Sequence, residues 1–239
     1  MRRRHDPELL DAPWHDPAEL AHSLEQVTEA NRRLGGVRAL RHHLRPILPR
    51  ERVRVLDVGT GNGDVLRDLV RWGRRRGGQG WSGVGVDLHP QVALEAASRN
   101  GGGADPGGDG RSRPVTVVRA DGLHLPFADG VFDAVTCTLT LHHFGAEDAV
   151  ALLREMMRVS RGRVVVNDLE RCLPNYLGAR LLALTWWRGN RLTRNDGPLS
   201  VLRSFTAAEL LELGRRAGLS SPRVSRHVPF RLVLVGGAR

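Results

Sequence analysis

The stretch VRVLDVGTGNGDVLRDLVRW, residues 53–72, decides the fold. Residues 53–58 are a short apolar run rich in β-branched side chains, and glycines follow it at alternate positions. Val65, Leu66, Leu69 and Val70 then recur at helical spacing, which places them on one face of a helix. The stretch therefore predicts a strand, a tight loop and a helix.

The same alternation continues downstream. Further strands are predicted at 82–88, 114–119, 131–138 and 163–168, with helical patterns at 91–98 and 147–159. Strands that alternate with helices predict a parallel sheet covered by helices on both faces. Right-handed crossovers would place the loops that follow the strands along one edge of this sheet.

The pattern of the last third of the chain differs from this alternation of strands and helices. A helix is expected over 206–218, and two strand-like runs, 222–227 and 230–236, are separated by little more than Val228-Pro229. So short a connection predicts a hairpin with an antiparallel last strand. The fold class expected is therefore α/β, a Rossmann-like doubly wound sheet of seven strands, mostly parallel, with a C-terminal antiparallel hairpin and an N-terminal helical cap.

Outside this core, helical patterns at 16–34 and 37–45 predict that residues 1–50 form the helical cap. Residues 51–239 are expected to form the second domain, with an apolar insertion at 171–205. The glycine-rich stretch 99–113 is interpreted as a flexible connector without a site.

Composition favours a cytoplasmic enzyme. The chain has 239 residues and a formal net charge of +10, but every positive charge is arginine, so the sequence pI of about 11.3 does not itself indicate nucleic acid. Cys137 and Cys172 form neither a disulfide framework nor a zinc motif. No apolar run follows the first arginines, so neither a secretory signal nor a transmembrane segment is expected.

The glycine-rich loop at 59–63 predicts a nucleotide-like ligand, because such a loop brings backbone and a helix N-terminus close to an anionic group. The dinucleotide pattern G-x-G-x-x-G is not met, since the third glycine comes one residue early. Asp57, two residues before the first glycine, adds a carboxylate. This spacing favours another ligand.

The pattern D-x-G-x-G-x-G resembles motif I of class I S-adenosylmethionine-dependent methyltransferases. Asp87, at the end of the second strand, resembles the family's ribose-binding acid, and Asp121-Gly122 resembles its adenine contact. The run Leu141-His142-His143-Phe144 resembles a signature that follows the fourth strand in this superfamily. The resemblance implies S-adenosylmethionine as cofactor. The implied cofactor-binding residues are Asp57, Gly59, Thr60, Gly61, Asn62, Gly63, Asp87, Leu88, Asp121, Gly122 and Thr138.

A closer resemblance concerns the acceptor. Asn167-Asp168-Leu169 with Arg171, then 195–198, Ser200 and Arg203, look like small bacterial methyltransferases associated with type III polyketide synthases. The resemblance implies O-methylation of a small phenolic or polyketide-type hydroxyl in natural product biosynthesis. The alternatives are C-methylation of a quinol or other aromatic ring, and RNA methylation. Nucleic acid is the less favoured partner, because the signatures of base methylators are absent.

Three histidines are candidate proton acceptors. His142 and His143 follow the fourth strand, and His227 lies near the turn of the predicted hairpin. A helix-capping role for the first two and an exposed turn position for His227 are the alternatives. Methyl transfer needs no metal, and none is expected.

Substrate contacts are expected from Asp168, Arg171, Trp186 and Arg203. The apolar run 176–187 is a candidate lid over a lipophilic substrate, and core or dimer packing is an equal alternative. Weak docking at a membrane surface is a further possibility, because arginines flank Trp186 and Trp187. The protein is expected to be a monomer or a homodimer.

Overall fold

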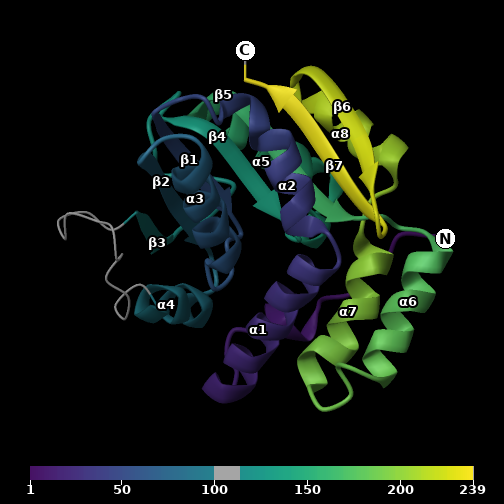
Figure 1. Cartoon of the computed structure of the whole chain (residues 1–239). Helices are drawn as coiled ribbons and strands as arrows, with labels where there is room; N and C mark the ends of the chain where they lie inside the picture. The colour runs from purple at the N-terminus through teal and green to yellow at the C-terminus, as the bar shows by residue number, and fades with distance from the viewer. Residues whose placement is uncertain (100–113, 239) are drawn as a thin grey trace.

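A computed structural model describes residues 1–99 and 114–238 (Figure 1). Its seven strands form one sheet in the order β3-β2-β1-β4-β5-β7-β6. The strands are β1 (Arg52–Val58), β2 (Gly80–Asp87), β3 (Val115–Arg119), β4 (Phe132–Thr138), β5 (Ser160–Leu169), β6 (Ser220–His227) and β7 (Arg231–Gly237). Only β7 runs against its neighbours, β5 and β6, while the other pairs are parallel. The predicted fold class is confirmed.

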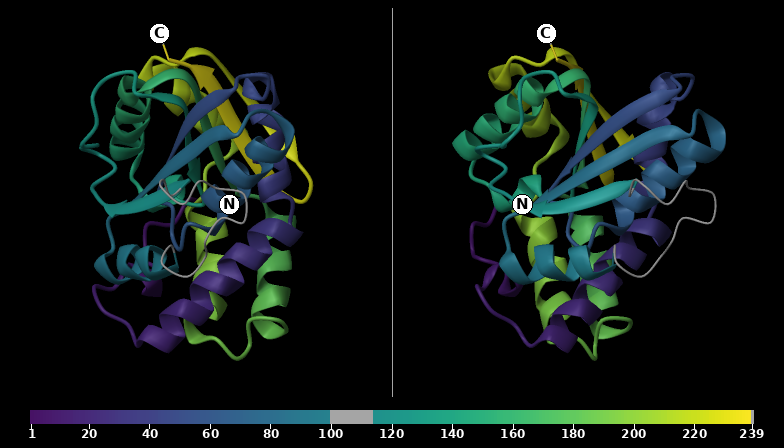
Figure 2. Two further views of the ribbon diagram at one scale, coloured as in Figure 1. Left: turned by 60° about the vertical axis from the view of Figure 1, so that its left-hand side comes forward. Right: turned by 90° about the vertical axis from the view of Figure 1, so that its left-hand side faces the viewer.

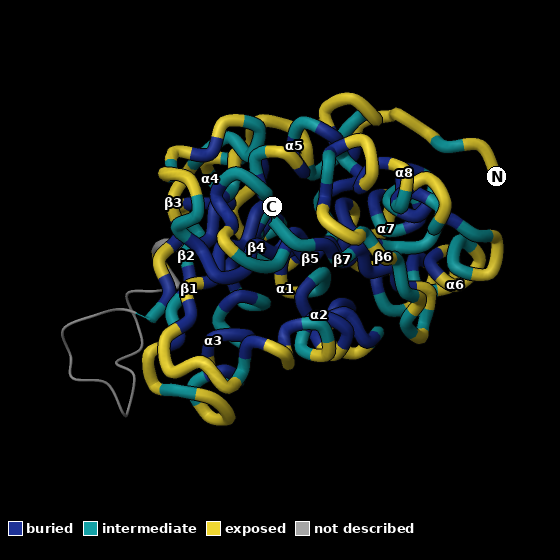
Figure 3. The backbone as a smooth tube through the Cα atoms, turned by 90° about the horizontal axis from the view of Figure 1, so that it is seen from above, coloured by how far each residue is buried: buried dark blue, intermediate teal, exposed yellow. Residues whose placement is uncertain are grey.

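Helices cover both faces of the sheet. On one face α2 (Gly36–Leu44) and α3 (Asp64–Arg76) pack against β1, β2, β5 and β7, and α5 (Ala146–Val159) and α8 (Ala207–Ala217) cover the other. Each face has its own apolar core, because alternate residues of a strand point to opposite faces. All of β4 is buried, and Figure 3 shows the central strands in dark blue. The centre of the sheet is thus a rigid base for the loops at its edge.

The remaining helices gather at the carboxyl ends of the parallel strands (Figure 2). They are α1 (Pro17–Arg33), α4 (Pro90–Arg99), α6 (Leu173–Leu184) and α7 (Arg191–Arg203). The α1 helix begins as expected at Asp16, whose carboxylate accepts the backbone N–H groups of Ala18 and Glu19 at 3.0 Å. The expected insertion at 171–205 is a pair of packed helices, α6 and α7.

The predicted connector 99–113 lies outside the described residues except for Arg99, the last residue of α4. Within the ranges 1–99 and 114–238, no helix has the length and apolar character needed to cross a bilayer.

Candidate active site

A cavity of about 650 Å³ opens where β1, β2 and β4 end. Its floor is the loop that follows β1, and its walls come from the loops after β2, β3 and β4. Residues of α1 and of the N-terminal segment 10–13 close the opposite side. A ligand site at the carboxyl ends of the strands is where an open α/β sheet places one.

The loop after β1 turns sharply because its glycines adopt positive φ angles. Gly59 has φ +68° and a Cβ there would lie 2.3 Å from the Thr140 side chain, so only glycine fits. Gly61 has φ +57°, and nothing lies within 4 Å of where its Cβ would be, so this backbone faces open space in the cavity. A ligand can therefore approach the main chain closely at Gly61.

Asp57, near the end of β1, holds this loop in place through hydrogen bonds. Its carboxylate accepts a hydrogen bond from the hydroxyl of Thr60 at 2.9 Å and another from Thr136 at 2.6 Å. Burial raises the pKa of Asp57 to about 6, although both hydroxyl bonds oppose the rise. Asp57 thus orders the loop and also contributes to the lining of the cavity.

Asp87 ends β2 with its carboxylate beside the glycine loop. Its two oxygens accept the backbone N–H groups of Gly61 and His89, each at 3.0 Å. Burial raises the pKa of Asp87 despite these two bonds. Asp121, after β3, accepts the N–H of Leu123 at 2.9 Å and lies at the same cavity. Two carboxylates from neighbouring strands therefore face one ligand space.

Ten of the eleven predicted cofactor-binding residues line the cavity. They are Asp57, Gly59, Thr60, Gly61, Asn62, Asp87, Leu88, Asp121, Gly122 and Thr138. Gly63 is not part of the lining; it precedes α3 with φ +76°. Its role is to start the helix, so its inclusion among contact residues has no support in the geometry.

His142 does not reach the cavity. Its side chain is 2% exposed, its Nδ1 lies 2.7 Å from Asp168 Oδ1, and its Nε2 lies 3.4 Å from Glu8 Oε1. Although burial lowers the pKa of His142, Asp168 and Glu8 raise it to about 10. A ring protonated at neutral pH and held between two carboxylates cannot accept a proton, so the geometry argues against His142 as a base.

His143, in contrast, lines the cavity and is partly exposed. Its Nδ1 lies 2.9 Å from Asp11 Oδ1, and its Nε2 lies 3.7 Å from Glu8 Oε2. Burial raises the pKa of Asp11, but its bonds to His143 and Arg203 lower it overall. The ligand atoms of Glu8, His142 and His143 all lie within 4.8 Å of one another, a spacing compatible with a metal ion.

The four expected substrate residues do not line the cavity, and two of them, Arg171 and Arg203, hold the N-terminal segment. Arg203 donates to the carbonyl of Asp6 and to the carboxylate of Asp11, each at 3.0 Å. Arg171 donates to the carbonyl of Met1 and to Glu209. Asp168 binds His142, as described above. All three side chains are 8% exposed or less, so their contacts hold neighbouring parts of the protein in place.

The 171–205 insertion contributes no residue to the lining of the described cavity. Trp186 packs in a small cluster with Ala30, Ala183 and Trp187, and Arg33 lies over its ring. The cover of the cavity comes from Leu10, Asp11 and Pro13 and from α1. The N-terminal cap, and not the expected lid, therefore covers the cavity.

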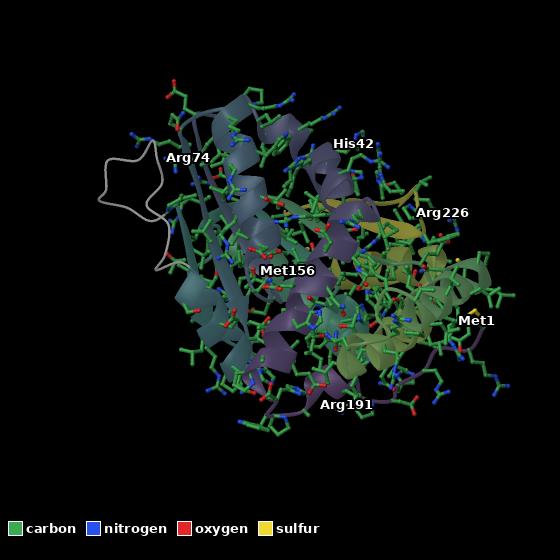
Figure 4. The ribbon with its side chains drawn as sticks, turned by 60° about the horizontal axis from the view of Figure 1, so that its bottom comes forward. Met1, His42, Arg74, Met156, Arg191 and Arg226 are labelled. Carbon is green, nitrogen blue, oxygen red and sulfur yellow. The ribbon has the colours of Figure 1, made fainter. Side chains whose placement is uncertain are left out.

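His227 lies apart from the cavity. Its Nε2 is 2.9 Å from His43 Nε2 and 3.1 Å from Ser225 Oγ. Figure 4 shows His42 of the same cluster on α2, beside the β6–β7 hairpin where Arg226 is labelled. Burial lowers the pKa of His227, and the positive charges around it lower it further. A catalytic role for His227 is not supported by this position.

Sequence reasoning missed the acidic residues of the N-terminal segment. Glu8 and Asp11 reach His142 and His143 across more than 130 positions of the chain. Asp196 fixes this segment by accepting the N–H groups of Leu9 and Leu10 at 2.8 and 2.9 Å. The short run Pro-Glu-Leu-Leu-Asp before the first helix was the available signal, but it does not reveal its distant partners.

The chain is similar in sequence to known methyltransferases. The methyltransferase domain family matches residues 56–166. The chain is 35% identical over 178 residues to a demethylmenaquinone methyltransferase of Thermobifida fusca, covering 72% of this chain and 69% of that protein. It is also 35% identical over 123 residues to a protein of the same name from Roseiflexus sp., of which it spans only 44%.

Solved structures show the same fold. A SAM-dependent methyltransferase from Aquifex aeolicus superimposes with a TM-score of 0.64 at 15% identity, over 95% of this chain and 100% of that one. Magnesium protoporphyrin IX methyltransferase from Synechocystis, with bound SAH, superimposes with a TM-score of 0.56 at 16% identity, over 93% and 86%.

Proposed function

Because this chain belongs to the class I S-adenosylmethionine-dependent methyltransferases, we propose that it methylates a ring carbon of a quinol-type aromatic acceptor. The observation that carries this proposal is the similarity to demethylmenaquinone methyltransferases, at 35% identity over 72% of the chain for the Thermobifida protein. Quinol C-methylation therefore replaces phenolic O-methylation as the favoured reaction. A link to polyketide synthases has no support in these relatives.

The residues of the cavity fit S-adenosylmethionine. The exposed backbone at Gly61 suits the methionine end, the Asp87 carboxylate suits the ribose hydroxyls, and Asp121 suits the adenine amine. A volume of about 650 Å³ leaves room for an acceptor beside the cofactor. When bound, the cofactor supplies a methyl group that its sulfonium makes electrophilic.

The apolar part of the lining suits an aromatic ring. Leu10 of the N-terminal segment and Leu24 and Val27 of α1 line the cavity, and Phe144 lines it from the loop after β4. Methyl transfer from a sulfonium to an ionised ring loses charge in the transition state, so a water-poor apolar pocket favours it. Positioning by this pocket is the main catalytic contribution that we assign to the protein.

His143 is the proton acceptor in this proposal. Nδ1 of His143 donates to the Asp11 carboxylate at 2.9 Å, so Nε2, which lies 3.7 Å from Glu8 Oε2, is the atom that takes the proton of an acceptor hydroxyl. The ionised oxygen then shares its charge with the neighbouring ring carbon. That carbon would take the methyl group that the bound cofactor supplies, and its own proton would leave to water, which restores the aromatic ring.

The proposal is tested with S-adenosylmethionine carrying a ¹³C methyl group. The purified protein is incubated with a reduced demethylmenaquinone and, separately, with alkylresorcinols as phenolic acceptors. We expect a methyl carbon bound to a ring carbon of the quinol, identified by its NMR shift. A methyl ether as the main product, or transfer to the resorcinols alone, would contradict quinol C-methylation.

A further inference from the structure

A buried arginine without a partner lies at the start of β7. Arg231 is 2% exposed, and its Nε and Nη1 find no hydrogen-bond partner in the part of the chain that the structure describes. The same is true of Oδ1 of Asn167 and of both polar side-chain atoms of Asn31. Folded proteins pair the large majority of such atoms, so a group of unpaired ones needs an explanation.

Strand register brings these side chains to one face of the sheet. Asn167 of β5 lies opposite Val233 of β7, and Arg231, two residues before Val233, points to the same face. Asn167 donates to the carbonyl of Gly36 at 3.3 Å. A Cβ on Gly36 would lie 1.8 Å from Asn31 Oδ1, so the Asn31 side chain of α1 also packs against Gly36. Asn31 and Asn167 thus meet at Gly36, where α2 begins, and Arg231 lies on the same face of the sheet, beside α2.

Among the described residues, no carboxylate accepts a hydrogen bond from Nε or Nη1 of Arg231. Burial lowers the pKa of Arg231 to about 10, so the guanidinium is still charged at neutral pH. Asp168 is the acid that acts on it, but this carboxylate already accepts from the ring and the backbone of His142 and from the N–H of Leu169. Burying a charge without a partner is strongly unfavourable, which points to an anion that completes the site.

Two residues of the cavity lining lie next to Asn167. Asn31 lines the cavity, and so does Thr138, whose strand position pairs with Asn167. Thr138 Oγ1 is also without a partner among the described residues. Asn167 and Arg231 are not part of the lining, so an acceptor would reach them only after the Asn31 side chain moves aside.

We propose that Arg231, Asn167 and Asn31 form a subsite for an ionised oxygen on the ring of the methyl acceptor, either a phenolate or a carboxylate. The guanidinium donates charge-assisted hydrogen bonds to such a group, and the Asn31 amide adds a further donor. This inference rests on the proposed function, because it assumes that the acceptor shares the cavity with the cofactor. It adds that the acceptor carries an ionised oxygen besides the hydroxyl that gives its proton to His143.

The test compares matched ligands on protein saturated with S-adenosylhomocysteine. Isothermal titration calorimetry is performed with 2-naphthoate and with its neutral analogue 2-naphthamide. The wild-type protein is expected to bind the naphthoate more tightly. Arg231→Met should weaken naphthoate binding about 30-fold, or about 2 kcal/mol, and should change naphthamide binding less than about threefold. Arg223→Met, at an exposed position of β6, is the control and should change neither.

A second pair of measurements identifies the anion. 2-Naphthol is titrated below and above the pH at which it ionises, with wild-type protein and with Arg231→Met. Dependence on Arg231 only for the ionised naphthol would assign a phenolate, and dependence only for naphthoate would assign a carboxylate. Equal affinity of wild type and Arg231→Met for both anions would overturn the subsite.

Folding of the variants provides an independent check. Without ligand, Arg231→Met should melt at a higher temperature than wild type, because it removes an unpaired buried charge. A lower melting temperature with unchanged anion affinity would assign Arg231 a structural role and overturn the proposal. If Arg231→Met does not fold, Asn31→Leu replaces it and is expected to weaken naphthoate binding about fivefold; unchanged affinity would contradict the subsite.

The failure of this inference differs from the failure of the proposed function. Cofactor binding and methyl transfer to the quinol, with no preference for anionic ligands, would reject the Arg231 subsite alone. Anion binding through Arg231 without any transfer to the quinol would reject the proposed reaction and keep the subsite.

Discussion

The two sides of the cavity are built in different ways. On the side of β1, β2 and β3, the lining residues lie at or just after the carboxyl ends of the strands that position them, as Asp87 ends β2 and Asp121 follows β3. On the other side, the cover comes from the N-terminal segment, which Asp196 and Arg203 hold from α7. The side assigned to the cofactor in the proposed function, the cofactor side, thus depends on local sequence. The side assigned to the acceptor, the acceptor side, depends on contacts between distant parts of the chain.

The largest effect is expected from the histidine that joins the two sides. His143→Ala removes the proposed proton acceptor and should lower kcat by about 10²- to 10⁴-fold. Affinity for S-adenosylmethionine should change little, because the carboxylates on the cofactor side stay in place. Steady-state kinetics with the quinol and calorimetry with the cofactor separate the two effects. A fully active variant would exclude His143 as the base.

The buried pair on the acceptor side should be important for stability. Asp168→Asn leaves a charged His142 with one carboxylate fewer, and it should lower the free energy of unfolding by about 3–5 kcal/mol. Urea unfolding measures this loss. Asp129→Asn, whose side chain is 80% exposed and pairs with Arg158, is the control and should cost about 1 kcal/mol or less. Equal losses of unfolding free energy in the two variants would show that the buried pair stabilises the protein no more than an exposed pair does.

Alkaline pH should weaken the acceptor side. The folded protein raises the pKa of His142 from 6.5 to about 10, so the proton is bound more tightly in the folded state than in the unfolded state. This stabilisation is complete below pH 6.5 and is lost as pH rises through 10. The free energy of unfolding should therefore fall between pH 7 and 10, by up to about 1.4 kcal/mol per pH unit. A flat profile for the wild type would contradict the assigned charge state.

A smaller effect is expected where the N-terminal segment is fixed. Asp196→Ala removes the acceptor of two backbone N–H groups, at Leu9 and Leu10, and should cost about 1–2 kcal/mol. Hydrogen exchange should become faster at these two amides and stay unchanged in β4. Unchanged protection at Leu9 and Leu10 would mean that other contacts hold the segment.

The same division explains what the sequence could predict. The alternation of strands and helices predicted all seven strands and the C-terminal hairpin, because hydrophobic periodicity is a local signal. The glycine loop, Asp87 and Asp121 were predicted to lie together because parallel strands bring their following loops to one edge.

The acceptor side could not be predicted in this way. Nothing near His142 in the sequence shows that Glu8 and Asp168 enclose it, so it could not be distinguished from His143. The run around Trp186 is apolar enough for a lid, yet it packs against α1. Arg231 did leave a signal, since it is a charged residue at the start of the apolar run 231–235, but its burial becomes visible only in the folded chain.

The measurement that tests the central claim most directly is the affinity for S-adenosylmethionine of the wild type and of Asp87→Ala, determined by calorimetry. The buried Asp87 carboxylate faces the cavity and is assigned to the ribose hydroxyls. We expect saturable binding by the wild type, about 100-fold weaker binding by Asp87→Ala and no change for the exposed control Glu212→Ala. Equal affinity of Asp87→Ala and wild type would contradict the placement of the cofactor along β1 and β2.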